Sequence, residues 1–166
     1  MDACRDDQLE AGFTILELIV VLVIIAALMA IAVPTFLTAR ATANDRAAQS
    51  DLRTALVAAN TVYIDAQSFE NMTVSDLSAA EPSIRWEDGP TTVGPHTLGV
   101  DLTHDIESGN EDVGQPAILL VEDAGDGECF YAVQADQDSP YYGEGPQSGG
   151  QCDADQAVNV PLSRTL

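Results

Sequence analysis

A run of 22 residues without a charged side chain, residues 18–39, constrains this chain more than any other feature. As a helix rising about 1.5 Å per residue, the run can cross the roughly 30 Å of hydrocarbon in a bilayer. An acidic segment precedes it, and no small-residue cleavage site follows Val33, so it differs from an ordinary secretory signal peptide. We therefore expect a membrane-spanning helix that the mature protein retains.

Glu17 and Pro34 distinguish this run from a plain membrane anchor. A carboxylate next to lipid is costly and often marks a function, although near a helix end it can also stay hydrated at the interface. Pro34 lacks a backbone N–H, so we expect it to kink the helix without ending it.

The remainder of the chain is strongly acidic. The whole chain has 27 acidic residues, six arginines and no lysine, which gives a net charge of -21. Beyond Ala59, twenty acidic residues accompany only Arg85 and Arg164. Such a surface repels phosphate backbones, so the charge argues against nucleic-acid binding and predicts an acidic domain on an apolar stalk.

The helical pattern continues beyond the apolar run. Apolar or small residues recur with helical spacing at Leu52, Ala55, Leu56, Ala59, Val62, Tyr63 and Ala66. No helix breaker lies between Pro34 and Gln67, so one helix of about 80 Å over residues 13–66 is expected, with its second half packed on a sheet. A free-standing coiled coil, the alternative, needs more heptads than are present.

After Gln67 the sequence changes to short β-leaning runs. We expect strands at residues 84–86, 98–102, 117–122 and 129–135, with a hairpin turn at Asp126 and Gly127 between the last two. Residues 137–151 are rich in glycine and proline and cannot form a core, so they are expected to need a covalent cross-link that holds them in place. The predicted fold is α+β: a long amino-terminal helix on a small antiparallel sheet.

Cys129 and Cys152 flank this Gly- and Pro-rich segment, whereas Cys4 lies in the amino-terminal segment. A bond between Cys129 and Cys152 implies an oxidising compartment, and the alternative is two free thiols in a reducing one.

The string from Gly12 to Val21, GFTILELIVV, with an apolar helix after it and Pro34 seventeen positions beyond Glu17, resembles the leader and amino-terminal helix of type IV pilins and pseudopilins. Residues 34–40 and 45–53 are similar to type IV pilins of Gram-positive actinobacteria. The resemblance covers about residues 12–69. It implies a leader at 1–12, a transmembrane or filament-core helix at 13–39, an amphipathic half-helix at 40–66 and a β-rich head at 67–166.

By this resemblance, a prepilin peptidase cleaves after Gly12 on the cytoplasmic face, and the new amine of Phe13 is methylated. Glu17 then pairs with the Phe13 amine of a neighbouring subunit, the alternative being its own amine. Unlike most leaders of the family, residues 1–12 carry no basic residue next to the glycine and hold only Arg5. Charge counting alone would place the amino terminus outside.

The resemblance also implies the function: a structural subunit that resides in the cell membrane with a single span and then joins an extracellular helical filament of identical copies. An inner-membrane assembly platform is the further partner. The alternatives are a pseudopilin of a type II secretion or DNA-uptake system and a single-pass binding protein that never polymerises. A carboxy-terminal disulfide-bounded region favours a pilin, and Tyr141 and Tyr142 either lie on the fibre surface or cover the sheet.

No enzyme, cofactor or metal site is expected. His96 and His104 are isolated, and no nucleophile motif or phosphate-binding loop occurs. Asp123, Asp126 and Glu128 offer oxygen ligands for Ca²⁺, but they lack the order of an EF-hand and are more typical of a solvated acidic turn.

Overall fold

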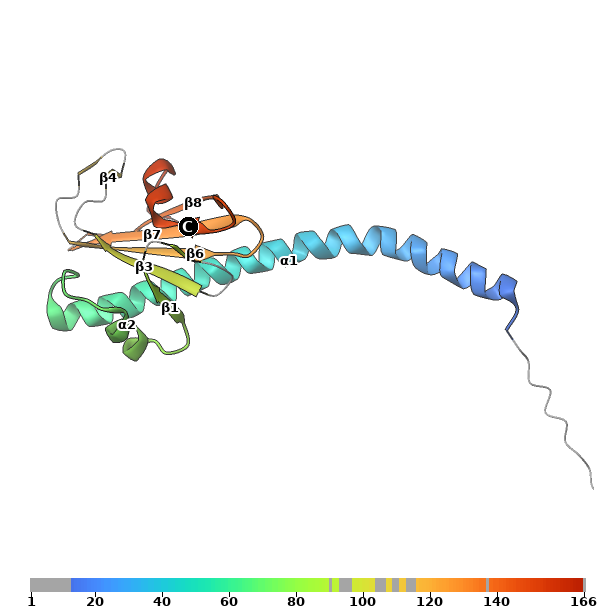
Figure 1. Cartoon of the computed structure of the whole chain (residues 1–166), viewed down its shortest axis with the longest axis horizontal. Coiled ribbons are helices and arrows are strands. Elements are labelled where there is room, and N and C mark those ends of the chain that lie inside the picture. The colour runs from blue at the N-terminus through green and yellow to red at the C-terminus, as the bar shows by residue number, and fades with distance from the viewer. Residues whose placement is uncertain are drawn as a thin grey trace, which may run out of the picture. The chain divides into compact units, whose positions relative to one another are not determined.

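The computed structural model describes residues 13–89, 91–92, 97–103, 107–108, 111–112, 116–136 and 138–165. The expected leader with Gly12, and also His96 and His104, lie outside the described residues. The chain forms two compact units, residues 1–39 and residues 40–166. One helix, α1 (Ile15–Ala66), belongs to both units (Figure 1).

The end of α1 agrees with the predicted helix. Ala66 is its last residue, and Gln67 has a φ of 58°, in the left-handed region that terminates helices. The Gln67 N–H donates to the Tyr63 carbonyl at 2.6 Å, and its side-chain amide donates to the Ile64 carbonyl at 2.8 Å. These bonds satisfy carbonyls that the ended helix leaves open.

Residues 40–166 contain a five-stranded sheet. The strand order is β1-β3-β6-β7-β8, and the bounds are β1 Arg85–Asp88, β3 Thr97–Thr103, β6 Ala117–Asp123, β7 Glu128–Ala135 and β8 Tyr141–Pro146. The four expected strands are present, and the α+β fold is confirmed. β8 was not expected, because its sequence reads as a loop.

One strand pair departs from the antiparallel expectation. The pairs from β3 to β8 are antiparallel, whereas β1 runs parallel to β3 with Trp86 opposite Leu98. The chain between them includes β2 (Thr91–Thr92), which pairs with β9 (Cys152–Asp153) outside the main sheet. Because the connection from β1 to β3 passes through β2, the two strands are not joined by a hairpin turn.

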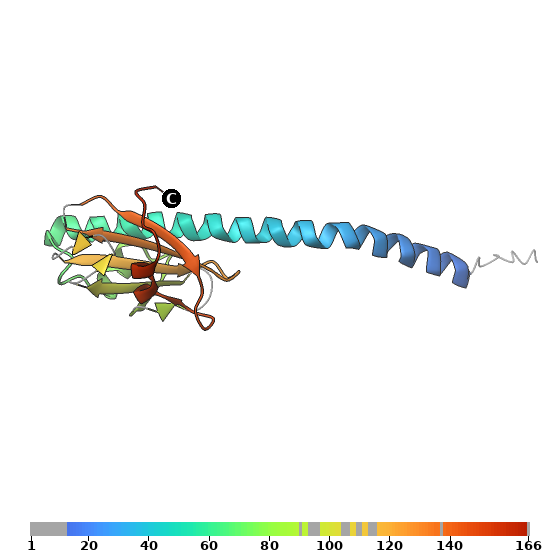
Figure 2. The same cartoon turned by 90° about the horizontal axis from the view of Figure 1, so that it is seen from above.

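The sheet is covered on both faces. The second half of α1 lies along one face, and the 3-10 helix η1 (Ala154–Asn159) lies on the other (Figures 1 and 2). Ile118 and Leu120 of β6 point to the α1 side, whereas Leu119 and Val121 point to the opposite core. This alternation with a period of two makes β6 buried throughout, as is typical of a strand in the middle layer of three.

The sequence did not predict several smaller elements, among them α2 (Val74–Ala80), β4 (Glu107–Ser108) and β5 (Glu111–Asp112). Helix α2 begins with a capping box, in which the Thr73 hydroxyl accepts from the Asp76 N–H and the Asp76 carboxylate accepts from the Thr73 N–H. Strands β4 and β5 pair with each other.

Candidate assembly helix and disulfide-bounded loop

The first half of α1 presents apolar side chains on every side. Ile15 is 80% exposed and Leu16 is 75% exposed, and none of the most apolar 18-residue window is buried. The window has a mean hydropathy of 3.1, so by length and composition the helix can cross a membrane. An apolar surface this continuous needs lipid or protein around it.

Glu17 lies in the first turn of α1, where the Thr14 hydroxyl accepts a hydrogen bond from the Glu17 N–H at 3.2 Å. Thr14 therefore caps the helix, and the Thr-x-x-Glu spacing was an available signal that the sequence analysis missed. The Glu17 side chain is exposed, and in the described part of the chain its carboxylate makes no hydrogen bond or ion pair. It is thus free to meet a cation of another molecule.

Pro34 lies inside α1, which continues beyond it for 32 residues. The Thr35 hydroxyl donates to the carbonyls of Ile31 at 3.1 Å and Ala32 at 2.9 Å, and the Thr38 hydroxyl donates to the Pro34 carbonyl at 3.1 Å. These hydroxyls bond to the backbone within the helix instead of needing water, which suits an apolar environment. A kink at Pro34 stays a prediction.

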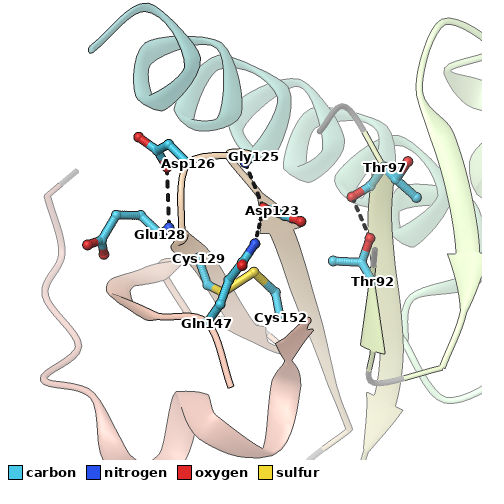
Figure 3. Close-up of a disulfide and its surroundings, with 9 residues drawn as sticks. All are labelled: Thr92, Thr97, Asp123, Gly125, Asp126, Glu128, Cys129, Gln147 and Cys152. Carbon is cyan, nitrogen blue, oxygen red and sulfur yellow. Dashed lines mark hydrogen bonds between the residues drawn. A yellow bond between two sulfur atoms is a disulfide. The ribbon is translucent and has the colours of Figure 1, made fainter. Parts of the chain in front are cut away.

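A disulfide joins Cys129 of β7 to Cys152 of β9, with their Cα atoms 5.5 Å apart (Figure 3). Both cysteines are fully buried in the core opposite α1. The bond closes the segment that contains β8 and thereby ties the carboxy-terminal layer to the sheet.

The acidic turn between β6 and β7 has structural hydrogen bonds. Asp123 is buried, and its Oδ1 accepts from the Gly125 N–H at 2.6 Å and the Gln147 side chain at 2.5 Å. Asp126 accepts from the Glu128 N–H at 3.2 Å (Figure 3). Over the described residues, no group of three His, Cys, Asp or Glu side chains is arranged to hold a metal. Asp123 instead fastens Gln147 of the disulfide-bounded segment to the turn.

The two tyrosines of β8 are both half-buried. Tyr142 packs against the core on the α1 side, and its N–H donates to the Ser163 carbonyl at 2.7 Å. Arg164 stacks over the Tyr141 ring at 5.1 Å and donates to its hydroxyl at 2.9 Å. Both tyrosines thus help to hold the carboxy-terminal segment.

Asp45 of α1 lies among other acids. Burial raises the pKa of its carboxyl, and the charge of Asp126, a side-chain hydrogen bond with Asp126 and the charge of Glu144 raise it further. The Oδ1 atom of Asp45 is buried and has no hydrogen-bond partner. The ionised form of Asp45 is therefore unfavourable within a single subunit.

Residues 8–33 match the family model of the prokaryotic N-terminal methylation motif. No curated protein and no solved structure matches the chain. The motif supports a pilin-like protein with a class III leader, of the type IV pilin or pseudopilin type. It also implies processing by a prepilin peptidase and a membrane-anchored precursor, and it suggests a structural rather than a catalytic protein.

Proposed function

We propose that the chain is a structural subunit of a type IV pilus-like extracellular fibre, most like those of Gram-positive actinobacteria. The observation that carries the proposal is an apolar helix bearing the methylation motif, with none of its most apolar window buried within the chain. A single-pass anchor would satisfy this surface with lipid alone. A filament subunit exchanges the lipid for the helices of its neighbours.

The proposed processing site is the bond between Gly12 and Phe13. A glycine has no Cβ, so an extended segment around it can enter a protease site closely. Cleavage would remove residues 1–12 and create an amine at Phe13, which is then methylated. Phe13 directly precedes the helix, so the new terminus would lie at the start of the apolar surface.

In the proposed assembly step, Glu17 pairs with the Phe13 amine of a neighbouring subunit. Removing two opposite charges from an apolar filament core favours association, because each charge alone is costly there. The assembly platform in the inner membrane would supply the work of extracting the helix from the bilayer.

The disulfide between Cys129 and Cys152 favours a pilus over a pseudopilus. The residues that resemble those of the actinobacterial pilins, 34–40 and 45–53, point the same way. The alternative is a pseudopilin of a type II secretion or DNA-uptake system, whose fibre does not extend from the cell surface. A single-pass binding protein that never polymerises is the third possibility.

Mass spectrometry of fibres sheared from the cell surface tests the proposal. We expect this chain in the sheared fraction, beginning at a methylated Phe13 and lacking Cys4. Substituting Gly12 by a bulky residue should leave an uncleaved precursor in the membrane and none in fibres. An exported protein that retains residues 1–12 would contradict the proposal, and a cleaved chain without surface fibres would favour the pseudopilin.

A further inference from the structure

β8 is the last strand of the five-stranded sheet, and among the described strands it pairs with β7 alone. A strand in this position presents unpaired backbone N–H and C=O groups along its outer edge, which a strand of another molecule can use. In an antiparallel pair, alternate residues direct these groups to the outer edge, and in β8 the outward residues are Tyr142, Glu144 and Pro146. The edge of β8 is therefore a surface on which a further strand can pair.

Residues 160–165, here called the strap, lie beside β8 and cover one part of this edge (Figure 1). Ser163 of the strap faces Tyr142 in an antiparallel bridge. The Tyr142 N–H donates to the Ser163 carbonyl at 2.7 Å, and the Ser163 N–H donates to the Tyr142 carbonyl at 2.8 Å. Both outward backbone groups of Tyr142 are thus satisfied within the subunit.

Side chains on either side of Ser163 hold the strap in place. Before it, the Leu162 side chain lies against Gly143, whose lack of a Cβ leaves the space. After it, Arg164 stacks over the Tyr141 ring at 5.1 Å, and its guanidinium lies 3.7 Å from the Asp138 carboxylate. Among the described residues, one bridge joins the strap to β8, whereas six residue pairs join β7 to β8. The strap is therefore attached more lightly than the strands of the sheet.

The rest of the β8 edge carries two further features that resist pairing. Glu144 is exposed and places a negative charge on the edge, and Pro146 has no N–H to donate. The backbone N–H and C=O of Glu144 point away from β7, and no hydrogen bond to them is present in the described part of the chain. Without the strap, Tyr142 and Glu144 would together offer an open site for another strand.

We propose that the strap keeps the β8 edge of one subunit from pairing with the β8 edge of a second copy of this chain. Once the strap is released, two β8 edges can lie antiparallel, with Tyr142 of each copy opposite Glu144 of the other and about four backbone hydrogen bonds between them. A second copy fits this site because the edge is self-complementary under a twofold axis. The inference concerns the head of single subunits and does not rest on the proposed function.

Proline substitution in the full chain, purified in a non-denaturing detergent, tests this role of the strap. Ser163→Pro removes the N–H that donates to the Tyr142 carbonyl and thereby opens the bridge. We expect the fraction of dimers and larger species, measured by light scattering, to rise roughly tenfold over the unaltered chain, because two backbone groups become free to pair. Ser163→Ala is the matched control, because it keeps both backbone hydrogen bonds, and it should change the fraction by less than about twofold.

A second proline shows whether the association runs through β8. Glu144→Pro removes the outward N–H of Glu144 and takes no hydrogen bond from β7, so the sheet should form as before. Added to Ser163→Pro, it should return the associated fraction to within about twofold of the unaltered chain. Association that persists in the double variant would assign it to unfolding or to another surface and overturn the inference. A Ser163→Pro chain that associates no more than the unaltered chain would also overturn it, and neither result depends on whether fibres form.

Discussion

At the scale of single residues, Glu17 and Asp45 are carboxylates that a lone subunit leaves poorly compensated. Glu17 is exposed in the first helical turn, and Asp45 is crowded by Asp126 and Glu144. Neither carboxylate stabilises the fold of an isolated subunit. In the proposed assembly step, the Phe13 amine of a second subunit would compensate the Glu17 carboxylate.

We predict that Glu17→Val leaves a cleaved, stable, membrane-resident subunit that enters fibres poorly. The substitution removes the charge that would pair with the neighbour's amine, and it does not touch the head. Glu17→Asp should retain partial function, because the charge survives on a shorter side chain. The measurement is the ratio of sheared-fibre to membrane-bound subunit, and an unchanged ratio for Glu17→Val would reduce Glu17 to a hydrated interfacial residue.

Asp45→Asn should stabilise the head at neutral pH. Because the pKa of the folded-state carboxyl is raised above its usual 3.8, ionised Asp45 costs stability above the raised pKa, and the cost vanishes as the pH falls below the usual value. The free energy of unfolding of the variant should thus exceed that of the unaltered head at pH 7, and the difference should shrink toward about pH 3.

Denaturant unfolding of residues 40–166 at several pH values measures this effect. Asp65→Asn is the control, because Asp65 is exposed on the same helix, and it should shift stability by no more than about 0.5 kcal/mol. A difference between Asp45→Asn and the unaltered head that stays constant with pH would show that the carboxyl does not titrate abnormally.

At the scale of elements, β8 is built around close approach to the carboxy-terminal segment. A Cβ added at Gly145 would lie 2.7 Å from the Val160 side chain, and one at Gly143 would lie 2.8 Å from Leu162. These glycines give β8 a flat face on which residues 160–162 lie. The turn-like composition of the strand is therefore a packing requirement.

Gly145→Ala should lower the free energy of unfolding by about 1–3 kcal/mol, as overpacking of a well-packed core does. Glu144→Ala on the same strand should change it by less than about 0.5 kcal/mol, because Glu144 is exposed. Thermal unfolding of residues 40–166 compares the two. Equal stabilities would mean that the carboxy-terminal segment moves aside at little cost.

Cys152→Ser should lower the stability of the head by roughly 2–5 kcal/mol, the usual loss when a small exported domain loses a native disulfide. The substitution also places a hydroxyl group in an apolar core. Reducing the unaltered head should give a similar loss, and Cys4→Ser in the precursor should give none. Two free thiols in a non-reduced head would contradict the bond.

The sequence predicts the elements whose signals are local. The apolar run, the stripe around Leu52 and Ala59 and the turn at Asp126 and Gly127 each obey one period or one turn rule, and α1, β6 and β7 form there. The capping spacing before α2 was also local but was overlooked. The direction of β1 and the formation of β8 depend on what packs across them, so no local pattern contains them.

The same limit applies to the candidate sites. The leader motif and the cysteine pair can be read directly, because one is a contiguous string and the other flanks a segment that cannot form its own core. Asp45, Asp126 and Glu144 come from a helix, a turn and a strand, and only the fold brings them together. Likewise, the paired amides of Asn60 and Gln134, 3.0 Å and 3.1 Å apart, link α1 to β7 over 74 positions.

At the scale of the whole molecule, the two compact units carry different chemistry. Residues 1–39 include the apolar surface and the methylation motif, and residues 40–166 carry a net charge of -17. The proposed association through the apolar helices would bring many negative heads together, and like charges in close array repel. In the proposed fibre, we expect the heads to be arranged so that the few arginines lie between carboxylates.

The disulfide would have a mechanical consequence if the proposed fibre is placed under tension. When a protein is stretched, each unfolded residue adds about 3.4 Å of length. Cys129 and Cys152 are separated by 23 positions. The covalent bond therefore prevents roughly 75 Å of extension even after the sheet has unfolded. Oxidised subunits should therefore set a shorter limit to how far a pulled fibre can lengthen than reduced ones, which links the redox state of the surroundings to the elasticity of the fibre.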